Sequence, residues 1–477
     1  MIRIICHNLI KWYSQGNYLE FKKTLENPKA TQLKILKSLT NINSYENFKS
    51  NFSVTDYADW KDLIEENRKK NPQSHFVPTS GSTHKIKWIP YTKKFKEELW
   101  LASSAWIHDL YSRYPAIKKG THYWSLSWLP QELRETQKNN DLDFFAGVEK
   151  YLLEQTMALD EGVASLPTLK DSMRESLVSL IEKDVTLISV WSPTFLLEIL
   201  DQLISDKEYF LFKIGDKNKK QALKNATSLE PALLKILIPD LVVISAWATS
   251  SSKTYSEKLK ILFPKVIFEA KGLWATEGVV TIPFAGKFPL AVNSHFYEFE
   301  IPDTGEILPS WKLSPGMKVC PIITTGSGLI RYRLNDLLIV TEMSEKTPCF
   351  EFLGRQNTLD LVGEKVSSDL ALKLILEIKN EFKVDALSLL AVQSHRPHYR
   401  LLVEGLSKLE IEENISDALE KKLLEHFHYK LARELNQLGK VKVLMKKDVY
   451  QDYIKLKEKT MTLKGNIKIE PLILVTE

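Results

Sequence analysis

Residues 186–278 constrain the fold most, because short apolar strands alternate there with helices. Within this stretch, residues 239–247 (PDLVVISAW) form a β-branched run that is typical of a strand buried in a parallel sheet. Residues 186–200 change from such a strand to a helix that begins with Ser-Pro, and residues 265–278 give a further strand and a turn. This alternation predicts an α/β domain whose ligands bind at the carboxyl ends of the strands.

The chain is too long for one hydrophobic core, since 477 residues are the length of two or three domains. Residues 1–75 are mostly helical in pattern, and residues 290–345 are rich in strands. After about residue 352 the pattern changes to a smaller α+β unit, with helices at 366–380 and 410–436 and strands at 386–393, 399–404 and 440–446. We therefore predict a large N-terminal domain over residues 1–353 and a small, mobile C-terminal domain over residues 354–477.

The composition is that of an ordinary soluble globular protein, with 44% hydrophobic and 26% charged residues. A net charge of +5 without clustered basic and aromatic residues argues against a nucleic-acid partner. No apolar run approaches the roughly 18 residues of a membrane span, and the first residues do not form a signal peptide. Three cysteines cannot form a disulfide framework and are not spaced as metal ligands. We expect a cytoplasmic monomer that does not bind membranes.

Residues 79–87 (TSGSTHKIK) combine small hydroxyl residues, one glycine and a closing lysine. Small residues let the backbone approach a ligand, and consecutive N–H and hydroxyl groups form a concavity that binds anions. The closing lysine can reach a phosphate as a point charge. The alternative is a solvated loop between two elements, and these nine residues alone do not decide between the two. The candidate phosphate ligands are Ser80, Gly81, Ser82, Thr83 and Lys87.

The segment GLWATEG, residues 272–278, places a carboxylate at the end of a predicted strand. Glu277 can hold Mg²⁺, a hard cation that prefers carboxylate oxygen. Thr276 can hydrogen-bond an oxygen of an α-phosphate. The alternative is a surface glutamate in a turn, which this short stretch alone favours.

Two later segments add candidate nucleotide ligands. Asp336 precedes an apolar strand, where its carboxylate can accept from both hydroxyls of a ribose, although a turn aspartate that caps local backbone fits equally well. In residues 352–369, Gly354 is expected to let the chain turn between domains, and Arg355 to meet the ribose or the phosphates. The Gly-Glu-Lys at 363–365 is assigned no catalytic role.

Together these segments resemble the adenylate-forming enzymes. The loop at 79–87 resembles their phosphate loop, and the IPYT after it is similar to that of the acyl-acid amido synthetases named for auxin-responsive promoters. KGLWATEG is similar to the bacterial members of that family throughout, and residues 332–336 (YRLND) resemble its Tyr-Arg-x-Gly-Asp. The matches follow the family order over residues 79–471, which is most of the chain.

The resemblance implies an α/β ligase that uses ATP and Mg²⁺ to convert a carboxylic acid to an acyl-adenylate, with release of pyrophosphate. An amine, expected to be an amino acid, then takes the acyl group. By the family's C-terminal pattern, Lys468 swings in to neutralise the reacting carboxylate and α-phosphate, so Lys468 and Glu277 are the expected catalytic residues. The helix after the loop borders the acyl pocket in the family, which makes Trp106 and Tyr111 expected substrate contacts, with Trp128 nearby. Their roughly helical spacing is also typical of a packed core.

Four positions depart from the family pattern and motivate the first of two alternative interpretations. His84 and Asn335 replace glycine, Ile330 replaces a frequent tyrosine, and Asn466 replaces glutamine. Asparagine is the residue that tolerates positive φ best after glycine. One alternative is a family member that binds a nucleotide or acyl ligand without turnover. The other keeps adenylation but transfers the acyl group to coenzyme A.

Overall fold

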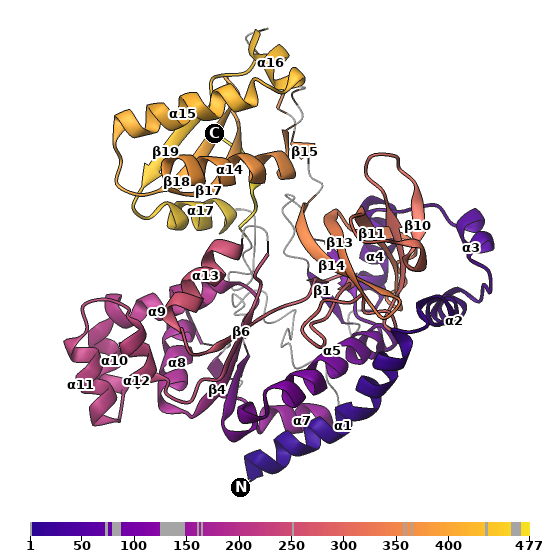
Figure 1. Cartoon of the computed structure of the whole chain (residues 1–477), viewed down its shortest axis with the longest axis horizontal. Helices are drawn as coiled ribbons and strands as arrows, with labels where there is room; N and C mark the ends of the chain where they lie inside the picture. Colours follow the sequence, from indigo (N-terminus) through magenta and orange to yellow (C-terminus); the bar gives the residue numbers. More distant parts are fainter. Residues whose placement is uncertain are drawn as a thin grey trace.

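The computed structural model describes residues 2–71, 75–78, 87–124, 148–159, 162–163, 166–249, 252–355, 358–359, 361–362, 364, 366–434, 437–458 and 469–477. Figure 1 shows these residues as a large body with a smaller unit at one end, which holds the C-terminus. The fold is mixed α/β, as the sequence predicts, with several separate sheets.

Helices form the first part of the chain: α1 (Ile2–Thr24), α2 (Pro28–Thr40), α3 (Tyr45–Asn51) and α4 (Tyr57–Lys70). The short strands β1 (Phe76–Pro78) and β2 (Trp88–Pro90) then pair in antiparallel fashion. The long helix α5 (Lys93–Arg113) follows, and the Thr92 hydroxyl caps it by accepting from the Phe95 N–H. This capping residue and Pro115, two residues beyond the helix end, account for the bounds of α5. Helix α1 packs along α5 at the base of the body (Figure 1).

The alternating segment forms a four-stranded parallel sheet in the order β3-β4-β5-β6. Its strands are β3 (Thr121–Trp124), β4 (Val185–Ser189), β5 (Val243–Ala246) and β6 (Ile267–Ala270). Leu187 and Val243 join the core around α5, whereas Ile188 and Ile244 join a second core on the opposite face of the sheet. Further helices contribute buried side chains to these two cores. They are α7 (Val148–Glu154), α8 (Leu169–Glu182), α9 (Pro193–Ser205), α10 (Lys207–Lys213), α11 (Lys217–Asn225), α12 (Pro231–Leu237) and α13 (Lys253–Leu262).

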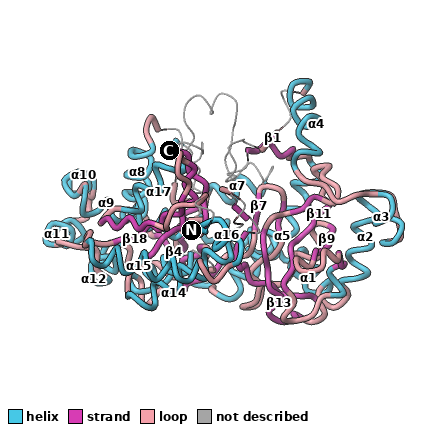
Figure 2. Tube along the Cα trace, turned by 90° about the horizontal axis from the view of Figure 1, so that it is seen from above, coloured by secondary structure: helices cyan, strands magenta, loops and turns pink. Residues whose placement is uncertain are grey.

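An antiparallel sheet forms the other side of the body, as the strand-rich pattern predicts. Its order is β10-β9-β11-β13-β14, with β12 paired to β11. The strands are β9 (Phe296–Glu300), β10 (Ile307–Pro309), β11 (Lys318–Thr324), β12 (Tyr332–Arg333), β13 (Asp336–Ser344) and β14 (Thr347–Arg355). A short hairpin, β7 (Trp274–Ala275) and β8 (Gly278–Val279), lies between the two large sheets when the chain is viewed from above (Figure 2).

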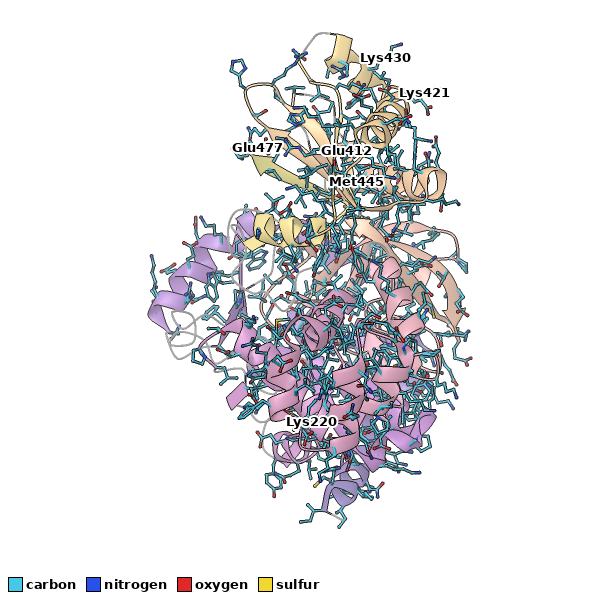
Figure 3. The ribbon with its side chains drawn as sticks, turned by 90° about the vertical axis from the view of Figure 1, so that its left-hand side faces the viewer. Lys220, Glu412, Lys421, Lys430, Met445 and Glu477 are labelled. Atoms are coloured by element: carbon cyan, nitrogen blue, oxygen red, sulfur yellow. The ribbon has the colours of Figure 1, made fainter. Side chains whose placement is uncertain are left out.

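The smaller unit has a four-stranded mixed sheet in the order β19-β18-β17-β20. It contains β15 (Thr358–Leu359), β16 (Val366–Ser367), α14 (Ser368–Phe382), β17 (Asp385–Gln393), β18 (His398–Glu404), α15 (Leu409–Leu423), α16 (Phe427–Glu434), β19 (Lys442–Lys446), α17 (Val449–Glu458) and β20 (Leu472–Thr476). Helices α14, α15 and α16 pack on one face and α17 on the other. The three predicted strands and the predicted helix at 366–380 are confirmed, and the helix predicted at 410–436 is divided into α15 and α16. The sequence analysis does not predict β15, β16, α17 or β20. Figure 3 shows Met445 and Glu477 in this unit and Lys220 at the far end of the body.

The smaller unit rests on α13 of the large body. Nζ of Lys258 lies 3.6 Å from the Asp385 carboxylate and 3.9 Å from that of Glu404. The rings of Tyr255 and Tyr450 lie beside each other, with centroids 6.2 Å apart. The contact combines an ion pair with packed aromatic rings.

None of the helices in the described ranges combines the length and apolar character that crossing a membrane requires.

A buried histidine fixes α1 to the body. Nε2 of His7 lies 2.8 Å from the Gly120 carbonyl and must donate to it, so Nδ1 accepts from the Tyr111 hydroxyl at 2.7 Å. The His122 ring lies 4.5 Å away, centroid to centroid. Burial lowers the pKa of His7 to about 4 and that of His122 to about 3. Both rings are therefore neutral in the folded chain at neutral pH.

We predict that acid loosens this attachment. The folded pKa lies below the unfolded value, so the unfolded chain binds more protons between pH 6.5 and about 4, and stability falls as pH falls through that window. The loss for His7 is about 3 kcal/mol at the low end. Denaturant unfolding of wild type and His7→Phe at pH 8, 6 and 5 measures it. The variant should be less stable at pH 8 but lose less stability on acidification. An equal pH slope in both proteins would contradict the assignment.

Candidate active site

The turn of the β7–β8 hairpin carries the predicted ligands Thr276 and Glu277, whose side chains are both partly exposed. The Tyr91 hydroxyl donates to the Thr276 carbonyl at 3.0 Å, which joins the turn to the segment after the predicted phosphate loop. A side chain at Gly278 would crowd the buried His295, because a Cβ there would lie 3.0 Å from its Nε2. The proposed magnesium ligand therefore stands on a turn that is held on two sides.

A buried pair, Glu98 from α5 and His295, ties this hairpin to a second loop. Nε2 of His295 accepts from the Val279 N–H at 3.2 Å, so the ring proton is on Nδ1, which donates to Glu98 at 2.7 Å. The same Glu98 oxygen accepts from the Gly326 N–H at 2.9 Å. Glu98 is 7% exposed and His295 is fully buried. One carboxylate thus joins the hairpin to the loop TTGSG (residues 324–328), which precedes the YRLND segment at 332–336.

Tyr332, from the third segment, reaches the same hairpin. Burial, and then the nearby Glu277 charge, raise the pKa of the Tyr332 phenol above its usual value, so the phenol keeps its proton beside the carboxylate. The backbone of Thr55 holds β12 in place by accepting from the Arg333 N–H at 2.9 Å.

Tyr57 is a residue that the sequence analysis does not identify. It follows Thr55 in a Thr-Asp-Tyr triplet at the start of α4, where Asp56 caps the helix. Its hydroxyl accepts from the Trp88 N–H at 2.8 Å, and its ring lies 5.6 Å from Nζ of Lys87. The tyrosine thereby supports the one predicted phosphate ligand that is described. Its position shortly before a candidate phosphate loop is the sequence signal that could have found it.

Arg331 fixes the backbone just before the YRLND segment at 332–336. It adopts a left-handed conformation with φ of 50°, and its guanidinium binds both oxygens of buried Glu298 at 2.8 and 2.9 Å. Asn335, which replaces the family's glycine, is not among the residues with positive φ. The backbone at position 335 therefore does not require glycine here. Ile330 packs in a small apolar cluster where the family often has tyrosine.

Asp336 begins β13 and is 7% exposed. It lies opposite Arg355 of β14, for which the structure describes the backbone. Gly354 lies inside β14, so the expectation that it turns the chain between domains is wrong. Its lack of a side chain instead allows close packing, because a Cβ would lie 3.0 Å from the Asp369 carboxylate. Asp336 and Arg355 are therefore brought together by strand pairing.

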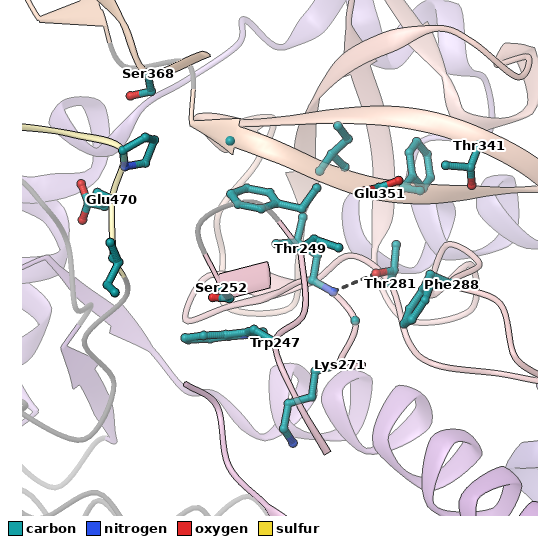
Figure 4. Close-up of a pocket in the computed structure, with 18 residues that line it drawn as sticks. Trp247, Thr249, Ser252, Lys271, Thr281, Phe288, Thr341, Glu351, Ser368 and Glu470 are labelled. Atoms are coloured by element: carbon teal, nitrogen blue, oxygen red, sulfur yellow. Dashed lines mark hydrogen bonds between the residues drawn. The ribbon is translucent and has the colours of Figure 1, made fainter. Parts of the chain in front are cut away.

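A pocket of about 190 Å³ lies between the large body and the smaller unit (Figure 4). Its walls include Gly272 of the GLWATEG segment, Leu338 of the strand that Asp336 begins, and Gly354 of residues 352–369. The tail enters it at residues 469–471, and Figure 4 shows Glu470 on the side opposite Thr281 and Phe288. Segments far apart in the sequence thus border one cavity.

The tail is anchored where it lines the pocket. Lys457 of α17 is 3% exposed and lies 2.9 Å from the Glu470 carboxylate. The Tyr453 hydroxyl accepts from the Glu470 N–H at 2.8 Å. These contacts fix the residues that follow Lys468 in the chain.

Several predicted site residues lie outside the described ranges: Ser80, Gly81, Ser82, Thr83, His84, Trp128, Asn466 and Lys468. Trp106 and Tyr111 are both described, on α5. Tyr111 is 2% exposed and its hydroxyl hydrogen-bonds to His7, so it has the surroundings of a core residue. Trp106 is 7% exposed but lies at the carboxyl end of the parallel sheet, beside the Trp124 ring at 5.8 Å. The two expected acyl contacts therefore stand in different surroundings.

Glu364 has a structural position, in line with the absence of a predicted catalytic role. It is 2% exposed and accepts from the N–H groups of Leu361 and Val362 at 2.9 and 2.8 Å. The Tyr399 hydroxyl also donates to it. The carboxylate thus ties the segment after β14 to the sheet of the smaller unit.

The described residues contain no group of three or more His, Cys, Asp or Glu side chains arranged to hold a metal ion. Mg²⁺ often uses only one or two protein carboxylates together with phosphate oxygens. A single partly exposed carboxylate at a turn, as Glu277 is, fits an ion that arrives with a nucleotide.

The chain matches the GH3 family in three successive parts. These are the N-terminal domain over residues 20–240, the central domain over 288–355 and the C-terminal domain over 375–475. Among solved structures, GH3.15 acyl acid amido synthetase is similar with a TM-score of 0.78 at 17% identity, over 96% of this chain and 93% of that one. AtGH3.15 acyl acid amido synthetase in complex with 2,4-DB gives 0.73 at 17%, over 98% and 93%. No curated protein sequence matches the chain.

We predict that Glu98→Ala destabilises the fold by about 2–4 kcal/mol, because it leaves two buried donors without an acceptor. Denaturant unfolding measures the loss, and substrate turnover should fall further than the folded fraction does. Glu97→Ala is the matched control, since the neighbouring Glu97 side chain is 64% exposed and should change stability by less than about 0.5 kcal/mol. Equal effects of the two substitutions would show that the buried contact is not important.

Proposed function

From the premise that this chain belongs to the GH3 family of adenylate-forming enzymes, ligases that make an acyl-adenylate and then an amide bond, we propose that it joins a small carboxylic acid to an amino acid with ATP and Mg²⁺. The observation that supports this most is the meeting of separate segments at the β7–β8 hairpin. There Tyr91, Glu98 and Tyr332 approach from the segments before and after it.

In the first step, a carboxylate oxygen of the acid attacks the α-phosphorus of ATP, and the bond to pyrophosphate breaks. Negative charge grows on the phosphate oxygens, so donors that are already in place lower the barrier. We propose that Thr276 donates to the α-phosphate and that the loop at 80–87 binds the remaining phosphates. Asp336 would accept from the ribose hydroxyls, with Arg355 beside it across the strand pair.

Glu277 is the residue that would hold Mg²⁺, and the ion would add positive charge at the phosphates. The protonated Tyr332 phenol beside Glu277 is placed to orient that carboxylate when the nucleotide arrives. In the second step, the amine nitrogen attacks the acyl carbon, and AMP leaves with the electrons of the acyl–oxygen bond. The amine also loses a proton, which gives a neutral amide.

The acid is proposed to be small, since one of the similar structures was solved with 2,4-DB. Acid-dependent exchange of labelled pyrophosphate into ATP tests the first step over a panel of carboxylic acids. Product analysis with mixed amino acids, and separately with coenzyme A, tests the second. We expect exchange with at least one acid and an amide as the product. A thioester product would identify coenzyme A, and not an amino acid, as the acceptor. Nucleotide binding without any exchange would indicate a protein that binds the nucleotide without turnover.

We predict that Lys468→Ala lowers pyrophosphate exchange by at least 100-fold while ATP binding changes little. The reason is that a mobile cation is needed when the carboxylate and α-phosphate approach, but not for binding the nucleotide. Lys464→Ala is the matched control, four residues earlier in the same tail. A larger loss in Lys464→Ala would assign the role of the mobile cation to Lys464. Normal exchange in both variants would show that neither lysine of the tail assists adenylation.

A further inference from the structure

The carboxyl end of the parallel sheet carries a concentration of tryptophans around one lysine. β3 ends at Trp124, Trp191 follows β4, and Trp247 follows β5 directly. Lys271 follows β6 in the same way. Ligands of parallel sheets bind outside this edge. Four neighbouring strands thus present three large aromatic rings and one cation where a ligand is expected.

The Lys271 ammonium group lies inside this aromatic cluster. Nζ is 4.9 Å from the centre of the Trp106 ring, 5.9 Å from Trp124 and 4.6 Å from Trp191. The Trp191 ring in turn packs against Trp247. In Figure 4 the Lys271 side chain extends away from Thr281 and Phe288, and both Lys271 and Trp247 are among the residues that line the pocket between the two units. The aromatic cluster therefore adjoins that pocket.

Two serine side chains add polar groups beside Lys271 at this end of the sheet. Nζ of Lys271 donates to Oγ of Ser189 at 2.8 Å, although Lys271 follows β6 and Ser189 ends β4. Ser245 of β5 pairs in register with Ser189 of β4 and with Glu269 of β6, two residues before Lys271. The stem of Lys271 must therefore cross the end of β5, on the face that α5 covers. The ammonium group is held in place over the sheet.

Three donors at this place have no acceptor among the described residues. They are Nε1 of Trp106, Nε1 of Trp124 and Oγ of Ser245, and all three atoms are buried. Trp106 is 7% exposed and Ser245 is fully buried. Buried donors are normally paired, because an unpaired one costs about 1–3 kcal/mol. Their common need is a hydrogen-bond acceptor that the described chain does not supply.

Resting on the proposed function, we propose that this tryptophan–lysine site binds the acid substrate, and that the acid is a flat aromatic carrying a second anionic group. The ring packs between the tryptophans, and the second group accepts from the indole and hydroxyl donors beside the Lys271 ammonium. A cation with neutral donors favours an anion over an apolar or cationic substituent. Lys271 is then a specificity-determining residue, and it takes no part in bond making.

Pyrophosphate exchange with benzoate and with the three benzenedicarboxylates tests the proposal. Wild type should use at least one dicarboxylate better than benzoate. Lys271→Met should lower kcat/KM for that dicarboxylate by about 10- to 100-fold, the worth of one hydrogen bond to a charged group. For benzoate the change should stay below about threefold. Trp106→Phe keeps a ring but removes one donor, and should show a smaller loss of the same selectivity.

Lys260→Met is the matched control, because Lys260 also lies over an aromatic ring, Phe268, but on α13. It should alter neither substrate. Equal losses with benzoate and dicarboxylate in Lys271→Met would reduce Lys271 to a packing role and overturn the proposal. Exchange with monocarboxylic acids alone would also overturn it, while leaving the proposed function intact.

Tryptophan fluorescence titrated with each benzenedicarboxylate, without ATP, separates the two proposals. Saturable quenching in wild type that Lys271→Met abolishes would support the site even if no exchange were found, and then the proposed function would fail alone. No quenching and no exchange with any dicarboxylate would overturn the site.

Discussion

The contact between Glu98 and His295 is the interaction on which the arrangement of this site depends. Both side chains are buried, and between them they satisfy backbone donors of two different loops. Such a pair is costly to bury and more costly to break, because either partner alone would be left unsatisfied. It fixes the hairpin of Glu277 relative to the TTGSG loop and to α5. Tyr91 and Tyr332 also contact the β7–β8 hairpin, whose position the Glu98–His295 pair already fixes.

A second buried pair does similar work at the other end of the third segment. Arg331 accepts an unfavourable backbone conformation, and its bidentate contact with Glu298 compensates for that strain. Tyr332, directly after it, thereby points toward Glu277, and Asp336 falls at the start of the next strand. Rigid supports of this kind suit a site where charge develops on phosphate oxygens, since donors need not reorganise during the reaction. The acyl site that we propose is built differently, from tryptophan rings at the edge of the parallel sheet.

Much of this could be predicted from local sequence. The parallel sheet follows from apolar runs such as PDLVVISAW, and α5 from its Thr92 cap and Pro115 stop. Thr276, Glu277 and Asp336 can be proposed from the sequence because a motif puts a polar group at a strand end. Glu98 and His295 cannot, because their partners are distant in sequence and no local pattern indicates the contact. Gly354 was misjudged for the same reason: its need for space comes from Asp369 on α14. For Tyr57 a signal exists, since it lies shortly before the candidate phosphate loop.

The central claim is that one adenylate occupies the space between the hairpin, β13 and the tail. A crystal structure of the chain with ATP and Mg²⁺ tests it most directly. The account predicts the α-phosphate at Thr276, the metal ion at Glu277 and the ribose hydroxyls at Asp336. A nucleotide bound elsewhere, with the hairpin of Thr276 and Glu277 untouched, would contradict it.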